Sequence, residues 1–159
     1  MKLLFTFIVA LPFVASAATT FEVDTKSSRI EWEGSKKVGG AHSGLLSLKA
    51  GKVVFEKNVP VSGEFVIDMT SINNTDLAEK ADMKAKLEGH LKSPDFFAIE
   101  EHPTSKFVIK SVKDLGENKY AFTGDMEIRG VTKEKTIEAE VKLDDKKVLA
   151  ESKFEIDRT

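Results

Sequence analysis

Residues 120–133 read YAFTGDMEIRGVTK, and this stretch decides the fold. Every second residue from Tyr120 to Ile128 is apolar or glycine, and most of the residues between them are polar. Successive side chains of a β-strand point to opposite faces, so this period of two predicts a strand with one buried face. The segment 130–133 then predicts a turn into a second alternating run over residues 137–143. We therefore expect an antiparallel hairpin here.

The same period of two governs most of the chain on both sides of this hairpin. It recurs over residues 21–33, 46–55, 63–69, 107–109 and 148–156. No internal repeat or linker interrupts the pattern, which indicates one domain. Antiparallel strands in this number either stack as a sandwich or close into a barrel. Their length and a single helical insertion favour a mainly β fold, an antiparallel barrel of about eight strands.

The helical insertion is predicted over about residues 73–98, where the period changes. Met83, Leu87 and Leu91 recur every four positions from Asp76 onward, which is typical of a helix with one apolar face. Asn74 or Thr75 is the expected N-terminal cap. We expect this helix to lie over one opening of the barrel.

A second, shorter helix is predicted after Ser93 and Pro94. Serine is a favourable cap, and proline is favoured at the first helical position. This helix would carry Phe96 and Phe97.

The apolar face of the strands is the candidate ligand-binding surface. Its predicted members are Trp32, Phe55, Phe65, Ile67, Met69, Phe107, Ile109, Phe122, Met126, Ile128 and Phe154. Gly63 and Gly124 fall on the same faces and occupy little volume. The chain has 11 Phe against one Tyr and one Trp, so such a lining would suit a hydrocarbon chain. Periodicity does not show a cavity, and a dry core filled by these side chains is the open alternative.

The first residues predict export. Lys2 precedes an apolar run over residues 3–14, and Ala15-Ser16-Ala17 supplies the small residues that a signal peptidase reads. We expect a signal peptide over residues 1–17 with cleavage after Ala17, a domain over residues 18–159, and a periplasmic or secreted location. The run is too short for a stable membrane anchor.

Charge and composition narrow the partners. The formal net charge is -2, and acidic and basic residues are interleaved rather than clustered. A nucleic-acid partner would require a basic stripe, so we expect none. There is no Cys, so packing and hydrogen bonds must hold the fold.

Four short segments are specific in their order and spacing: HLKSPDFF at residues 90–97, HPT at 102–104, Gly124 with IRGVTK at 128–133, and IDRT at 156–159. Together they resemble the YceI family of polyisoprenoid-binding, lipocalin-like barrels. The resemblance covers residues 21–159. It implies a secreted or periplasmic barrel that encloses an isoprenoid lipid, with the polar head near one mouth. It implies no enzymatic step and no cofactor besides this lipid.

The end of the sequence departs from the family pattern. In the family the chain continues beyond the segment that matches residues 157–159, whereas this sequence stops at Thr159. A final strand without a partner would expose backbone donors and acceptors. We expect a barrel domain truncated at its C-terminus, and the oligomeric state stays open, with a dimer possible.

Two polar residues are candidates for the lipid head group. His42 lies between glycines and resembles a family histidine, and Arg129 flanks the Gly130 turn together with Lys133. A histidine satisfied by backbone and ordinary charges beside a turn are the open alternatives. His90 is expected to help dock the helix.

No catalytic or metal-binding set is predicted. The three histidines are far apart, and no serine lies in a nucleophile-elbow context. We expect a protein that carries or sequesters an isoprenoid lipid and is not an enzyme. The alternatives are an enzyme acting on a lipid head group and a dry-cored structural or interaction module.

Overall fold

A computed structural model describes residues 17–35, 40–144 and 147–156. The elements are β1 (Thr19–Glu22), β2 (Ile30–Ser35), β3 (Ala41–Glu56), β4 (Val59–Asn74), α1 (Ala81–Lys92), β5 (Thr104–Gly116), β6 (Lys119–Ile128), β7 (Val131–Asp144) and β8 (Lys147–Ser152). Residues 1–16 of the predicted signal peptide and residues 157–159 of the last motif lie outside the described residues, so the expectations placed on them stay predictions.

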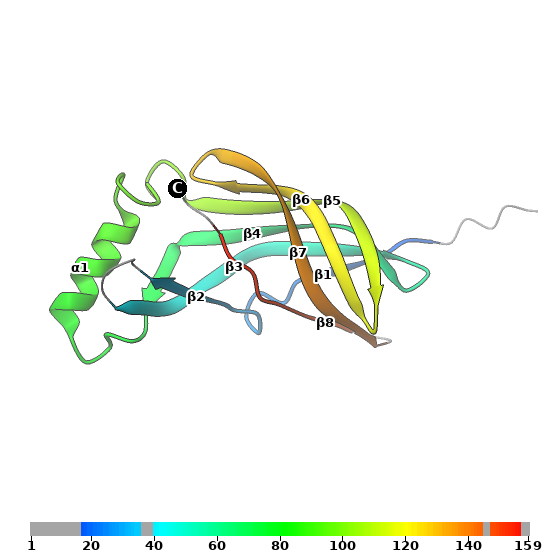
Figure 1. Cartoon of the computed structure of the whole chain (residues 1–159), viewed down its shortest axis with the longest axis horizontal. Coiled ribbons are helices and arrows are strands. Elements are labelled where there is room, and N and C mark those ends of the chain that lie inside the picture. The colour runs from blue at the N-terminus through cyan, green and yellow to red at the C-terminus, as the bar shows by residue number, and fades with distance from the viewer. Residues whose placement is uncertain (1–16, 36–39, 145–146, 157–159) are drawn as a thin grey trace, which may run out of the picture.

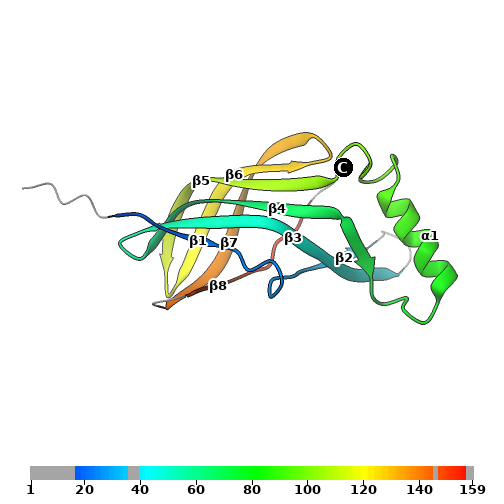
Figure 2. The same cartoon turned by 180° about the vertical axis from the view of Figure 1, so that it is seen from behind.

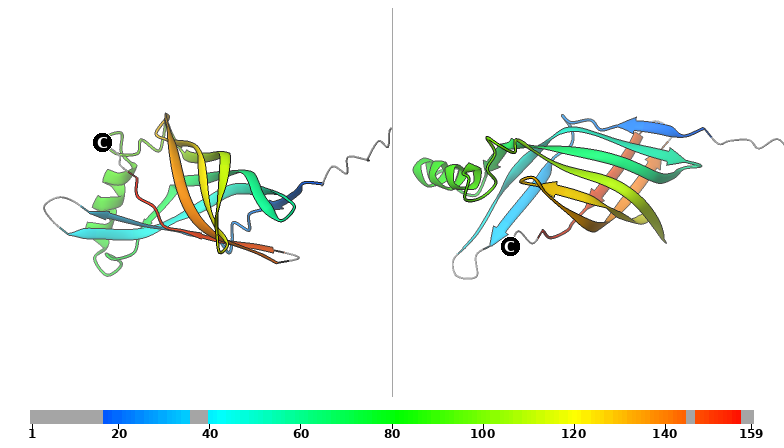
Figure 3. Two further views of the ribbon diagram at one scale, coloured as in Figure 1. Left: turned by 45° about the vertical axis from the view of Figure 1, so that its right-hand side comes forward. Right: turned by 90° about the horizontal axis from the view of Figure 1, so that it is seen from above.

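All eight strands join one antiparallel sheet in the order β1-β3-β4-β5-β6-β7-β8, with β2 also paired to β3. The sheet curls so that β7 and β8 come round to lie across from β3 and β4 (Figure 3). In the described chain β8 forms one edge of the sheet and pairs with β7, and β1 and β2 lie at the other edge and pair with β3. No pairing joins these two edges, so the barrel is nearly closed but not complete. The prediction of a mainly β, antiparallel barrel of about eight strands is confirmed.

The long strands β3 and β4 bend at irregularities in their pairing. The register shifts between Leu45 and Ser47, between Leu48 and Ala50, and between Val54 and Phe55. Such bulges add local twist and let a sheet curl. At the first of them the Ser71 hydroxyl accepts a hydrogen bond from the Ser47 N–H at 2.8 Å. The hydroxyl thereby satisfies a backbone donor that regular pairing would have occupied.

Glycines let neighbouring backbones approach closely in this sheet. A side chain at Gly124 would contact the backbone carbonyl of Val108 on β5, and one at Gly63 would lie 2.8 Å from the Lys52 carbonyl oxygen. The volume that these residues lack is therefore taken up by the adjacent strands. It does not add to the interior.

The helix differs from its prediction at its start. It begins at Ala81 instead of near Asp76, and Lys80 occupies the cap position without a side-chain hydrogen bond. Asn74 is still part of β4, and its Oδ1 accepts the Leu77 N–H at 3.0 Å in the connecting loop. The cap prediction is wrong because the side chain organises this loop and not the first turn of the helix.

The apolar face of α1 is also narrower than predicted. Leu91 is buried, Leu87 is half-buried, and Met83 is 54% exposed. The helix contacts β4 and lies at one end of the barrel, as seen from both sides in Figures 1 and 2. We call this end of the molecule the α1 end.

The prediction of a second, shorter helix after Ser93 and Pro94 is wrong. Residues 94–97 form a turn, and Ser93 has an extended backbone with ψ 164°. The Ser93 hydroxyl donates to the His90 carbonyl at 2.8 Å, which ends α1 instead of starting another helix. Phe96 and Phe97 stack edge to face at 4.7 Å within the turn, and His90 packs edge-on against Phe96 at 5.6 Å.

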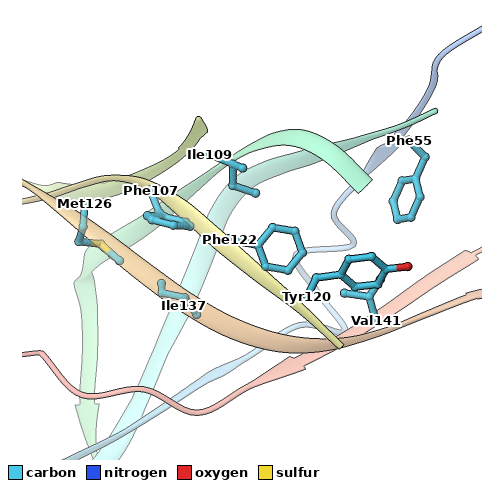
Figure 4. Packing of buried hydrophobic residues seen from close by; sticks show 8 residues of the cluster. All are labelled: Phe55, Phe107, Ile109, Tyr120, Phe122, Met126, Ile137 and Val141. Atoms are coloured by element: carbon cyan, nitrogen blue, oxygen red, sulfur yellow. The ribbon is translucent and has the colours of Figure 1, made fainter. Parts of the chain in front are cut away.

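Buried apolar side chains form one cluster inside the curled sheet (Figure 4). This core cluster consists of Phe55, Phe107, Ile109, Tyr120, Phe122, Met126, Ile137 and Val141. Phe55 and Tyr120 lie close to the β3–β4 and β5–β6 hairpins, at the end of the barrel away from α1. The core cluster thus reaches the end of the barrel away from α1.

Candidate functional site

The pairing register identifies the inner face of the barrel. Phe65, Phe107 and Met126 pair in one row across β4, β5 and β6, and Ile109 pairs with Gly124 in the next row. Directly opposed residues of antiparallel strands point to the same side of the sheet. These rows lead into the core cluster, so they define the inner face.

Most of the predicted lining residues are brought together on this face. Five belong to the core cluster: Phe55, Phe107, Ile109, Phe122 and Met126. Met69 is also buried, and Trp32, Phe65, Ile67 and Ile128 are half-buried. Phe154 is the exception, because it lies beyond β8 and is 42% exposed. The structure does not place it with the others.

Three core residues were missing from the predicted lining, namely Tyr120, Ile137 and Val141. The alternating pattern contains them, so the signal was present in the sequence. Ile137 pairs with Phe122, and Tyr120 pairs with Ala139. A lining derived from β6 alone therefore identifies its partners on β7 once the hairpin register is known.

Toward the α1 end, apolar side chains of the inner face are more exposed than those of the core cluster. Ile30, Trp32, Leu46, Leu48, Ile67 and Ile128 are half-buried. In the described chain no other segment covers these side chains fully, although they continue the apolar rows of the core. This is apolar surface that a long hydrocarbon chain could cover.

Trp32 anchors this surface on β2. It pairs with Gly44, and a side chain at Gly44 would meet the Trp32 ring at 2.7 Å. The indole therefore lies directly on the β3 backbone. Its Nε1 is buried and has no hydrogen-bond partner among the described residues. A buried donor without a partner costs about 1–3 kcal/mol.

His42 lies on the same face as Trp32, because it pairs with Gly34, two residues further along β2. Its Nδ1 is 2.8 Å from Oδ2 of Asp76. The other carboxylate oxygen of Asp76 accepts the Ser43 N–H at 2.9 Å and a hydrogen bond from the Asn74 amide. The Ser43 N–H, His42 and Asn74 lower the pKa of Asp76 to about 2.

A second set of polar contacts holds α1 against β4. Glu88 accepts the Asn74 N–H at 2.7 Å, and the Lys84 ammonium donates to the Asn73 side chain at 2.8 Å. Asn74 itself is fully buried. The polar residues at this end therefore fix α1 against β4 and hold the loop that carries Asp76.

The low pKa of Asp76 predicts an acid-sensitive loop. A carboxyl whose pKa is depressed in the folded protein stabilises it above the ordinary pKa of 3.8, and this contribution disappears as the pH falls through about 2. Thermal melts between pH 5 and pH 2 should show the native chain losing stability faster than Asp76→Asn. Parallel pH profiles for the two proteins would contradict the assignment.

The two predicted head-group residues both lie at the α1 end, each with a protein partner. His42 is held by Asp76, and the Arg129 guanidinium donates to the Pro94 carbonyl at 2.6 Å. Arg129 has a positive φ of 53° beside Gly130, against which the His102 ring packs. Arg129 thus braces the β6–β7 turn on the loop that follows α1.

Two hollows stand out among the described residues, and both flank α1 outside the barrel. One, of about 280 Å³, is lined by residues of the α1 C-terminus and the following loop, including Lys92, Ser93 and Glu101. The other, of about 330 Å³, is lined by residues 79–83. Neither hollow is lined by the half-buried inner face, which is the candidate site for an apolar ligand.

Residues 17–35, 40–144 and 147–156 contain no group of three or more His, Cys, Asp or Glu residues placed to hold a metal ion. No helix among them has the length and apolar character needed to cross a membrane.

Comparison with known proteins identifies the family to which this barrel is similar. The model of the YceI-like domain matches residues 21–159. A UPF0312 protein of Vibrio campbellii is 33% identical over 136 residues, which cover 83% of this chain and 67% of that protein. A UPF0312 protein of Photorhabdus laumondii is 44% identical over 57 residues, 36% of this chain and 29% of that protein.

The crystal structure of Burkholderia cenocepacia BcnA has the same fold, with a TM-score of 0.60 at 20% identity over 82% of this chain and 77% of that one. A barrel of this family is consistent with binding a hydrophobic ligand. The family match, the similar sequences and the shared fold agree: the chain belongs to the YceI-like domain family.

Proposed function

We propose that this protein binds the hydrocarbon chain of a long isoprenoid lipid along the inner face of its barrel and carries or sequesters it outside the cytoplasm. One observation supports this above others. The apolar inner face continues from the buried core cluster into the half-buried residues of the α1 end, among them Trp32, Leu46 and Ile67. Half-buried apolar surface next to a core is what an apolar ligand would cover.

The energetics favour a long ligand. Each buried methylene contributes about 0.8 kcal/mol, so several isoprene units can supply tight binding without any hydrogen bond. The proposed role is binding and not catalysis. The only histidine–carboxylate contact on this face, among the described residues, is the pair of His42 and Asp76, and hydrogen bonds from Ser43 and Asn74 hold Asp76 in its loop.

The test is whether the protein purified from cells carries a bound lipid, which its mass would show. The chain is purified without detergent and measured by native mass spectrometry, before and after extraction with organic solvent. We expect an added mass that extraction removes and that matches an isoprenoid. Adding a C20 polyprenol to the extracted protein should raise its melting temperature, because only the folded barrel binds the lipid. A mass equal to that of the protein alone, together with a melting temperature that the polyprenol does not change, would favour the dry-cored module instead.

A further inference from the structure

Little apolar packing holds α1 against the barrel. Leu91 is buried, whereas Leu87 is half-buried and Met83 is 54% exposed. The two hollows described above flank the helix, one beside residues 79–83 and the other beside its C-terminal end. Closely packed protein interiors contain few voids larger than a water molecule. The helix is therefore packed loosely on the end of the barrel.

Two hydrogen bonds to the end of β4 hold the helix in place. The Glu88 carboxylate accepts the Asn74 N–H at 2.7 Å, and the Lys84 ammonium donates to the Asn73 side chain at 2.8 Å. When such bonds break and water enters, water replaces the lost partners, so the net cost of breaking them is small. These contacts can therefore open and form again without disturbing the sheet.

The chain on each side of α1 is anchored to the barrel. Before the helix, the Asp76 carboxylate accepts the Ser43 N–H of β3 at 2.9 Å. After the helix, the Pro94 carbonyl accepts a hydrogen bond from the Arg129 guanidinium at 2.6 Å. Residues 77–80 and 93 lie between these anchors and α1, outside any helix or strand. Such loop residues can absorb the backbone rotations of a hinge, so the helix can move while the chain on either side stays attached.

The apolar surface that the proposed ligand would cover lies at this end of the barrel. Trp32, Ile67 and Ile128 are half-buried there. Toward the other end, Phe55 and Tyr120 of the core cluster are buried close to the hairpins. A hydrocarbon chain that enters from the α1 end therefore displaces fewer packed side chains than one that enters from the other end.

We propose that α1 is a lid, which moves away from β4 to admit the hydrocarbon chain of the ligand to the inner face and then closes again. This inference rests on the proposed function and adds the route by which the ligand enters and leaves. The two hydrogen bonds to β4 are formed in the closed protein whether or not a ligand is inside. Weakening them therefore speeds entry and release equally and leaves the affinity unchanged.

The variant that tests the lid is Lys84→Ala/Glu88→Ala, which removes both hydrogen bonds to β4. The matched control is Asp82→Ala/Lys86→Ala. It also removes one acidic and one basic residue four positions apart in α1, but from exposed positions. Glu88→Gln is a second control, because its amide oxygen still accepts the Asn74 N–H.

The probe ligand is geranylgeraniol, a C20 isoprenoid alcohol. Its binding is followed by the fluorescence of Trp32, the single tryptophan, which lies on the inner face. Equilibrium titration gives the affinity. Mixing the loaded protein with an excess of phosphatidylcholine vesicles gives the release rate, because the vesicles take up the lipid that leaves the barrel.

We expect Lys84→Ala/Glu88→Ala to release geranylgeraniol about 5- to 20-fold faster than the native chain, with an affinity within about 2-fold of the native value. Both controls should release it at nearly the native rate. In the ligand-free protein, hydrogen exchange of the α1 amides should be faster in Lys84→Ala/Glu88→Ala, whereas exchange of the β5 and β6 amides should not change. This second measurement shows that the rest of the barrel stays folded.

Three results would overturn the lid. If the α1 amides exchange faster but release does not, the ligand leaves by another route, such as the unpaired seam between β8 and the β1–β2 edge. If release speeds up only as far as affinity is lost, α1 stabilises the complex and does not gate it. If Asp82→Ala/Lys86→Ala releases the lipid just as fast, the two hydrogen bonds to β4 do not control opening. Failure of the native chain to bind geranylgeraniol would instead count against the proposed function, and the lid would fall with it.

Discussion

Replacing Gly124 with alanine is expected to lower the free energy of unfolding by about 2–4 kcal/mol. The new methyl group would contact the Val108 carbonyl and would lie 2.9 Å from the Ile109 Cα. Both are backbone atoms of β5, which is paired with β6 along most of its length. No side chain can rotate away to relieve the contact, so one of the two strands has to shift.

Gly89→Ala is the matched control for this substitution. Gly89 lies within α1, and nothing stands within 4 Å of the methyl group that alanine would add. Alanine is favoured over glycine in a helix interior by about 1 kcal/mol, so this variant should be slightly more stable than the native chain. Urea denaturation of the three proteins measures both effects. If Gly124→Ala unfolded at the same urea concentration as the native chain, the close approach of β5 and β6 would be disproved.

The strands were predictable because their signal is local. Alternation from Tyr120 to Ile128 identifies an inner face without any knowledge of its partners, and the structure places those residues on one face of β6. The helix was less predictable. Asn74 has the chemistry of a cap, but it lies in β4 and its backbone pairs with Gly44 of β3, and a tertiary contact of this kind leaves no trace in the spacing of residues.

In the candidate site, too, features with a local sequence signal were predictable and tertiary contacts were not. Periodicity identified residues that share the inner face, whereas Phe154 lies apart from them because the alternation continues past Ser152, where β8 ends. The contact between His42 and Asp76 joins residues 34 positions apart and needs the barrel to bring them together.

Ile67→Asp is expected to lower the affinity for a C20 isoprenoid at least about 100-fold, equivalent to about 2.7 kcal/mol. Ile67 pairs with Leu48 and Ser105 on the half-buried part of the inner face. A bound hydrocarbon chain would have to remove water from the new carboxylate without offering it a partner, and would also lose contact with the isoleucine.

Val66→Asp is the control for that variant, because it adds the same charge one residue away on the opposite face. Val66 is half-buried, like Ile67, and pairs with Lys106, which offers the carboxylate a cation. We expect this variant to bind the isoprenoid nearly as well as the native chain.

The loss caused by Ile67→Asp should be the same for a C20 alcohol and a C20 acid, since both present the same hydrocarbon chain to the inner face. Equal affinities of Ile67→Asp and Val66→Asp would mean that the ligand lies elsewhere, because a chain on the inner face must distinguish two adjacent residues that point to opposite sides of β4.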